Sequence, residues 1–234
     1  MNGVALGDRT AYVEAGDVVV LADLHVGRDE SSAVSLPLGE AADLRERLGR
    51  SLSRFDPETV VVAGDVVHTF GGVSDRSREI LDDLDATCAA AGADLELVAG
   101  NHDAALSTAW DGELHAEYAF GGDDTPRTVV CHGHEEPAAA ADRYLFGHVH
   151  PTITIDGDRR PCFLYGAESY RQTDVVCLPA FTRLAPGVAV GGLRAGETAS
   201  PLIPDPGRLE PIVYDPNADE RFRFPPLEAF REAL

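Results

Sequence analysis

Short apolar runs alternate with amphipathic segments over the first hundred residues of the chain. Residues 17–24, 58–65 and 94–101 are typical of buried strands, because each is a brief run rich in valine or leucine that ends in polar residues. Residues 37–53 and 74–92 separate these runs and predict helices, since their apolar positions recur at helical spacing. The order strand–helix–strand–helix–strand favours a parallel sheet with crossover helices.

End signals support both predicted helices. Pro37 stands in the first turn of the first helix, where its missing N–H costs nothing. Ser74 is suited to begin the second helix, and Gly92 is suited to end it in a C-cap position.

The second half of the chain changes character and predicts strands with few helices. Turn-like GGDD at 121–124 and DGDR at 156–159 indicate hairpins. We expect a second, mixed or antiparallel sheet packed against the first. The predicted strands are residues 127–134, 142–150, 151–157, 161–166 and 173–180.

The tail from Gly196 is rich in proline. It is predicted to wrap the surface and to end in a short helix near LEAFREAL. The chain of 234 residues suits one domain at 1–195, with the tail at 196–234 packing on that same domain.

Composition changes the picture through charge. The 19 basic residues are all arginine, and with 40 acidic residues the net charge is −21. Hydrophobic content of 44% argues against disorder, so we expect a folded, acidic, lysine-free surface of the kind found in halophilic proteins. Without lysine, a Walker A loop, a Schiff base and a lysine general base are excluded. The four cysteines lack C-x-x-C spacing and are expected to be reduced and buried.

Neither a secretory signal nor an apolar run of membrane-spanning length is visible in the sequence. We therefore expect a cytoplasmic protein with no membrane partner.

Five of the apolar runs end in Asp, Asn or His. Because ligands bind outside the carboxyl ends of strands in α/β sheets, these side chains are expected to converge. Alone, each group has a commoner explanation as a cap, a turn or a surface loop. Together they are too many for one ion and predict two divalent ions, with Asp65 between glycine and valine as the bridge. The residues at these ends are Asp23, His25, Asp65, Asn101, His102, Asp103, His132, His134, His148 and His150.

The mixture of carboxylate, amide and imidazole ligands favours a borderline metal over Ca²⁺ or Mg²⁺. Mn²⁺ is the expected ion, with Fe, Zn, Ni and Co as alternatives.

These blocks resemble the calcineurin-like metallophosphoesterase superfamily. They are DLH at 23–25, GD at 64–65, GNHD at 100–103, CHGH at 131–134 and GHVH at 147–150. Their order and spacing are similar to those of a small archaeal and bacterial branch found beside DNA ligase or helicase genes. The resemblance implies an α/β fold, a four-layer αββα sandwich of two mixed β-sheets flanked by helices.

The resemblance also implies a role for each residue at the strand ends. His102 would serve the leaving oxygen, and Asp103 would orient His102. One departure is His68, which stands where many relatives carry Asp and which leaves substrate preference open. The implied ligands are Asp23, His25 and His150 for the first metal, Asn101, His132 and His148 for the second, and Asp65 as the bridge.

The implied activity is metal-dependent hydrolysis of phosphodiester or phosphomonoester bonds by a hydroxide that two metal ions activate. A small phosphodiester, a nucleotide or a single-stranded nucleic-acid fragment are all candidate substrates. Arg28 and His134 are candidate substrate contacts, and Tyr144 and Tyr165 are candidates to stack on a base or to lie buried in the sheet.

Two other classes of protein remain open. An amidohydrolase would need a full (β/α)₈ barrel, which fits a β-rich second half poorly. A non-catalytic metal-binding scaffold for protein interactions would share the αββα fold, but the retained His102 favours an enzyme.

Overall fold

Two β-sheets lie face to face in the computed structural model, which describes residues 1–30, 39–68 and 72–232. The six-stranded sheet comprises, in spatial order, β1 (Val4–Leu6), β2 (Ala11–Val13), β3 (Val18–Leu21), β4 (Thr59–Ala63), β5 (Asp94–Val98) and β6 (Leu114–His115). The seven-stranded sheet comprises, in spatial order, β16 (Glu220–Arg223), β15 (Glu210–Asp215), β12 (Phe163–Tyr170), β13 (Thr173–Cys177), β9 (Arg143–Phe146), β8 (Thr125–Cys131) and β7 (Tyr118–Gly122).

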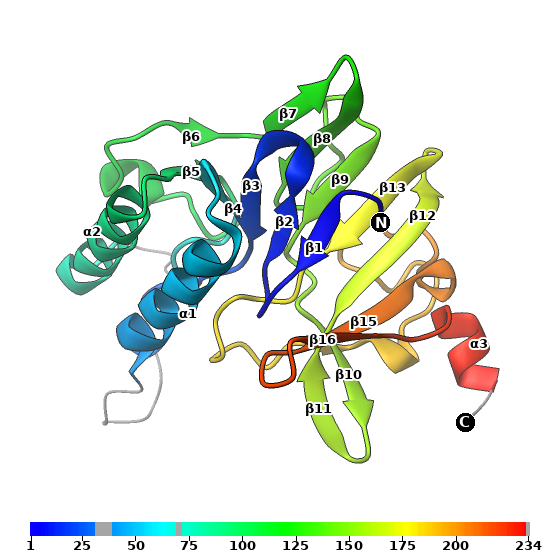
Figure 1. Ribbon diagram of the computed structural model, residues 1–234. Coiled ribbons are helices and arrows are strands. Elements are labelled where there is room, and N and C mark those ends of the chain that lie inside the picture. The colour runs from blue at the N-terminus through cyan, green and yellow to red at the C-terminus, as the bar shows by residue number, and fades with distance from the viewer. Residues whose placement is uncertain (31–38, 69–71, 233–234) are drawn as a thin grey trace.

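A small third sheet extends from this pair. It contains β11 (Asp158–Pro161), β10 (Pro151–Ile155) and β14 (Val188–Ala189), and the β10–β11 hairpin projects from the body of the molecule (Figure 1).

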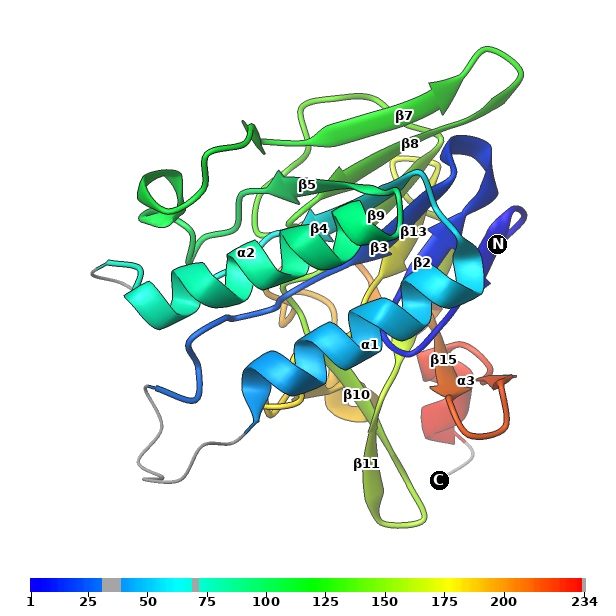
Figure 2. The same cartoon turned by 60° about the vertical axis from the view of Figure 1, so that its left-hand side comes forward.

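The predicted parallel unit is present in the six-stranded sheet. Strands β3, β4 and β5 are parallel neighbours, linked by α1 (Glu40–Phe55) and α2 (Asp75–Ala90). Ser74 caps α2 by accepting a hydrogen bond from the Ser77 N–H, and Gly92 follows the helix with a φ of +82°. Both helices cover the same face of the sheet (Figure 2). The first helix starts at Glu40 and ends two residues beyond the predicted end; Pro37 lies outside the described residues.

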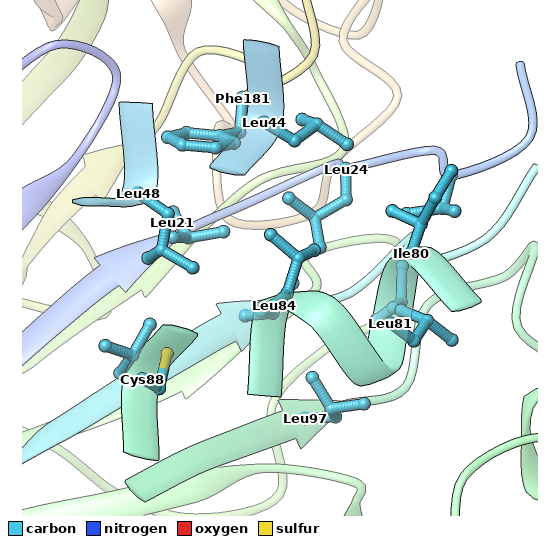
Figure 3. Close-up of a cluster of buried hydrophobic side chains, with 14 of the residues drawn as sticks. Leu21, Leu24, Leu44, Leu48, Ile80, Leu81, Leu84, Cys88, Leu97 and Phe181 are labelled. Carbon is cyan, nitrogen blue, oxygen red and sulfur yellow. The ribbon is translucent and has the colours of Figure 1, made fainter. Parts of the chain in front are cut away.

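Valine-rich strands suit a position between two apolar layers. Val19 and Leu21 of β3 point toward the helices, whereas Val18 and Val20 point toward the second sheet. Figure 3 shows leucines of α1 and α2 converging on the strands, with Phe181 beside them. Burial of each such side chain stabilises the fold by about 1.5–3 kcal/mol. These packed layers therefore hold the strands, and with them the strand ends, in fixed positions.

The far face of the seven-stranded sheet is also covered. Leu202, Ile203, Leu209 and Leu227 pack there, the last from α3 (Leu227–Glu232). The predicted αββα layering is therefore confirmed, with an outer layer built from irregular segments and the short α3.

The tail does more than wrap the surface, and that prediction was wrong in part. Strand β15 pairs antiparallel with β12, and β16 pairs with β15 at the edge of the sheet. Proline is tolerated near sheet edges, so Pro211 does not prevent β15 from forming. The predicted terminal helix is present as α3.

None of the described helices combines the length and the apolar character that a membrane span requires.

Candidate metal centre

Five strands from the two sheets bring their carboxyl ends to a common edge. Asp23 and His25 follow β3, Asp65 follows β4, and Asn101 follows β5 in the first sheet. The second sheet places its residues after β8 and β9, namely His132, His148 and His150. The structure thus brings together all seven residues that the sequence proposed as metal ligands.

The turns that carry these side chains depart from ordinary strand geometry. Backbone φ angles are positive, between +48° and +66°, at five of the proposed ligands. Left-handed backbone costs a non-glycine residue about 1 kcal/mol or more and persists only where the surroundings impose it. Such concentration of strain is typical of functional sites. The five residues are Asp23, His25, Asp65, His148 and His150.

Backbone hydrogen bonds hold the turns after β3 and β4 together. The N–H of Asp23 donates to Gly64 O at 3.0 Å, and the N–H of His25 donates to Asp65 O at 2.9 Å. The next pair continues the pattern, because the Val26 N–H donates to Val66 O at 2.9 Å. Asp23, His25 and Asp65 are therefore positioned by one rigid element.

The first cluster contains Asp23, His25, Asp65 and His150, whose ligand atoms all lie within 4.8 Å of one another. His150 Nε2 lies 3.3 Å from Asp23 Oδ1 and 3.3 Å from His25 Nε2. Asp65 Oδ2 faces this cluster, 3.7 Å from His25 Nε2.

The second cluster contains Asp65, His132 and His148. His132 Nε2 lies 3.3 Å from Asp65 Oδ1, 3.2 Å from His148 Nδ1 and 2.9 Å from Asn101 Oδ1. The two oxygens of Asp65 thus face different clusters, so this carboxylate could contact an ion in each.

Glycine is needed where the turns approach one another. A Cβ on Gly100 would lie 2.2 Å from the backbone N of Asp65, and one on Gly64 would lie 2.4 Å from His132 Nδ1. Any larger residue would push the turns after β4 and β5 apart, or displace His132. Gly64 and Gly100, which precede Asp65 and Asn101, are therefore required by the close approach of these turns.

Burial sets the charge state of the cluster. It lowers the pKa of His25 to about 3, and it also lowers the pKa of His132 and of His148, so these rings are neutral and can donate a lone pair to a metal. Burial and the nearby Asp23 carboxylate raise the pKa of Asp65.

Two carboxylates, those of Asp23 and Asp65, are thus buried side by side at 0% and 2% exposure. Within the described chain, the ion-pair partners within 4.0 Å of them are histidine rings. Buried like charges of this kind need a cation, so the donor set fits bound divalent metal.

His102 faces the cluster without belonging to either group. Its ring lies 5.4 Å from that of His25, its side chain is 20% exposed, and its backbone N–H donates to Asp65 Oδ1 at 3.0 Å. This is a suitable place for a group that meets substrate.

Asp103 is engaged by backbone amides. Its carboxylate accepts hydrogen bonds from the N–H groups of Gly100, Val66 and Val67 at 2.7–3.2 Å. These bonds fix the turn after β5 against the turn after β4. That Asp103 also orients His102 stays a prediction.

His68 lies closer to the centre than the sequence indicated. Its Nδ1 is 3.4 Å from His25 Nδ1, and its ring stacks on that of His102 with centroids 5.7 Å apart. The hydrogen-bonded pairing of His68 N–H with Val26 O carries it there. Its position beside His25 could not be predicted from the sequence, because the hydrogen bond that places His68 joins the segment after β4 to the segment after β3.

The proposed substrate contacts lie at the rim of the cluster. Arg28 donates from Nε to Leu184 O at 3.1 Å, and its charge helps to lower the pKa of His25 and of His68, where burial is the larger cause. The His134 ring lies 5.1 Å from that of His132 and is partly exposed. Their contact with substrate stays a prediction.

Neither tyrosine offers a face for a nucleobase. Tyr144 and Tyr165 are 4% and 6% exposed, and their hydroxyls donate to Ala139 O and to Asp174 Oδ2. They belong to the sheet core, the commoner of the two alternatives. The four cysteines are likewise free thiols and buried.

The fold and the cluster together define an αββα protein with buried Asp and His side chains that could hold metal. A family model described as calcineurin-like phosphoesterase matches residues 16–174, more than half of the chain. The protein belongs to the calcineurin-like phosphoesterase family, which indicates hydrolase activity.

Two solved structures align with most of this chain, and the first of them shows a similar fold. Nuclease MPE of Pseudomonas putida aligns with a TM-score of 0.59 at 21% identity, covering 90% of this chain and 91% of that one. Yfce, a phosphoesterase from E. coli, aligns with a TM-score of 0.47 at 13% identity, covering 89% of this chain and 98% of that one. No curated protein sequence matches this chain.

Metal binding is expected to release a proton near pH 6.5. Burial by itself would lower the pKa of His150, but the Asp23 carboxylate outweighs it and raises that pKa above 6.5. The ring is therefore mostly protonated at pH 6.5 in the metal-free protein and must lose its proton to bind a metal. Calorimetric titration with Mn²⁺ at pH 6.5 in buffers of different ionisation enthalpy should give a release of more than about half a proton per chain, with less released and tighter binding as the pH rises.

His150→Ala should abolish this proton release, whereas His115→Ala, at a histidine that pairs with Glu96 and belongs to neither cluster, should leave it intact. If the apparent binding enthalpy is the same in every buffer, metal binding does not remove a proton from His150.

Proposed function

We propose that the protein is a binuclear metal-dependent phosphoesterase that hydrolyses phosphodiester bonds, and phosphomonoesters as a secondary class. The division of the Asp65 oxygens between two clusters carries this proposal. Asp23, His25 and His150 would hold one ion, Asn101, His132 and His148 would hold the other, and Asp65 would bridge. Bound divalent ions would supply charge neutralisation on phosphorus and a nucleophile from water at neutral pH.

The chain's own groups do the rest. The positive-φ turns hold the ligands in place before metal arrives, so little ordering is needed on binding. His102, at the rim and partly exposed, would donate a proton to the departing oxygen. His68, stacked on His102, would restrict the orientation of that ring.

A panel of esters tests the proposal. Bis(p-nitrophenyl) phosphate, p-nitrophenyl phosphate and a short single-stranded oligodeoxynucleotide would be incubated with Mn²⁺, Fe²⁺, Co²⁺, Ni²⁺ or Zn²⁺, with metal content measured on the same sample. The nucleic acid belongs in the panel because one structural neighbour is a nuclease and because the sequence resembles a ligase- or helicase-associated branch. We expect Mn²⁺-dependent diester hydrolysis that EDTA abolishes and that exceeds monoester hydrolysis.

Salt is the second variable of this assay. With a net charge of −21, we expect activity and folding to improve on going to about 1 M KCl, where the Debye length is ~3 Å. Bound metal without hydrolysis of any ester would instead favour the non-catalytic scaffold.

A further inference from the structure

A pocket of about 170 Å³ opens beside the candidate metal centre, and its walls carry an unusual charge for this protein. His150 forms part of its lining and also belongs to the first cluster, so the two features adjoin at this residue. Three of the other lining residues are Arg9, Arg159 and Arg183, and no Asp or Glu is among the lining residues. A local concentration of cations in a chain of net charge −21 calls for a reason.

Arg9 is held in this pocket by a strained turn and by backbone carbonyls. It lies in the turn between β1 and β2 with a φ of +62°. Its Nη1 donates to Ala180 O and to Thr182 O, both at 2.7 Å. Burial lowers the pKa of Arg9 to about 10, so the guanidinium still carries its charge at neutral pH. Carbonyl partners orient this charge but do not neutralise it.

Arg159 reaches the same pocket from the β10–β11 hairpin. Its Nη1 donates to Pro186 O at 2.9 Å, again a carbonyl and not a carboxylate. Arg183 is partly neutralised, because its Nη1 lies 3.1 Å from Asp43 Oδ1 and its Nη2 lies 3.8 Å from Asp8 Oδ2. Within the described chain no carboxylate lies within 4.0 Å of the guanidinium of Arg9 or Arg159, in contrast to Arg47, which pairs with Asp43.

Size and chemistry restrict what the pocket can hold. Its volume is below the 300–1,000 Å³ typical of sites that enclose a whole drug-sized ligand. Guanidinium groups match the oxygens of phosphate in geometry and charge. The repulsive field of the acidic surface would weaken binding of any anionic substrate unless cations are placed locally. A phosphate group is small enough for this volume, matches the guanidinium groups, and is an anion whose binding would need local cations.

We propose that this arginine pocket, defined by Arg9, Arg159 and Arg183 next to His150, binds a second phosphate of the substrate, separated from the scissile phosphate by a spacer as in consecutive nucleotides. This inference rests on the proposed phosphoesterase function and names its substrate class. The substrate is an oligonucleotide-like diester, and an ester with a single phosphate is a poor one.

Matched esters that differ by one phosphate test this proposal. The p-nitrophenyl ester of thymidine 5′-phosphate would be compared with the same ester bearing a 3′-phosphate, and the p-nitrophenyl ester of thymidine 3′-phosphate with its 5′-phosphorylated form. Measurements would use the lowest KCl concentration at which circular dichroism shows the folded protein. In one of the two pairs, the wild type should have a kcat/KM about tenfold or more higher for the ester that bears the second phosphate. Most of this difference should come from a lower KM.

Arg159→Gln and Arg9→Gln should each reduce this preference to about threefold or less. Arg160→Gln is the matched control, because Arg160 is the next residue of β11, does not line the pocket and pairs with Asp158. Arg9 also anchors residues 180–182, so the Arg9→Gln result counts only if the thermal midpoint of that variant equals that of the wild type. Arg159 is more exposed than Arg9, and Arg159→Gln therefore provides the independent test.

Equal kcat/KM within both pairs, or a preference that survives Arg159→Gln, would overturn the pocket assignment and leave the phosphoesterase proposal intact. Absence of hydrolysis of all four esters would overturn the phosphoesterase proposal instead. Calorimetry would then test the pocket. Thymidine 3′,5′-bisphosphate should bind to the wild type about tenfold more tightly than thymidine 5′-monophosphate does. In Arg159→Gln the two affinities should be about equal. Equal affinities in the wild type would refute the pocket assignment.

Discussion

Asp65→Asn is expected to lower metal content from two ions per chain to one or none and to reduce diester hydrolysis by at least about 10³-fold. The reason is geometric, because Asp65 Oδ1 faces His132 and Asp65 Oδ2 faces His25, and an amide offers one acceptor oxygen and no charge. Bound metal supplies several kcal/mol of transition-state stabilisation, which corresponds to this loss. Metal analysis by mass spectrometry and initial rates on bis(p-nitrophenyl) phosphate would measure both effects.

The same variant should stabilise the metal-free protein. Burial and Asp23 raise the pKa of Asp65, so the folded state binds this proton more tightly than the unfolded state does. Ionised Asp65 therefore destabilises the metal-free fold at neutral pH, and this penalty disappears as the pH falls toward 3.8. A higher thermal midpoint for metal-free Asp65→Asn at pH 7, converging with wild type at acidic pH, would separate loss of a ligand from misfolding.

Asp82→Asn, at an exposed position of α2, is the control and should change neither metal content nor rate. Two ions per chain in purified Asp65→Asn would show that this carboxylate is not the bridge.

His102→Ala should keep its metal but lose about 10²–10⁴-fold in rate on diesters whose leaving group is an alkoxide. The backbone N–H that donates to Asp65 Oδ1 is retained in alanine, so the ligand geometry should survive. A p-nitrophenolate leaving group needs little protonation, and its release should be affected far less. Rates on thymidylyl-thymidine and on bis(p-nitrophenyl) phosphate, measured with metal content, would give the two values.

His115→Ala serves as the control here as well, because His115 pairs with Glu96 and belongs to neither cluster. Equal losses on both diesters, or loss of metal, would assign His102 to ligand support in place of proton transfer.

Local patterns in the sequence were sufficient to predict much of the fold. Valine-rich runs and capping residues such as Ser74 act through nearest neighbours, so the alternation of β3, α1, β4, α2 and β5 was predicted with element ends that differ from the structure by three residues or fewer. The strands of the tail were not predicted, because proline at 211 discourages a strand locally and only pairing with β12 stabilises it.

The sequence by itself determined which residue types stand at the strand ends, because each follows its own apolar run. Tertiary structure alone decided that the oxygens of Asp65 face two clusters, that His68 lies against His25, and that Arg9 and Arg159 line one pocket together with His150. These outcomes depend on the packing of two sheets and on turns with left-handed backbone. These contacts join segments that are 40 or more positions apart and leave no local periodicity, so no pattern along the chain could have predicted them.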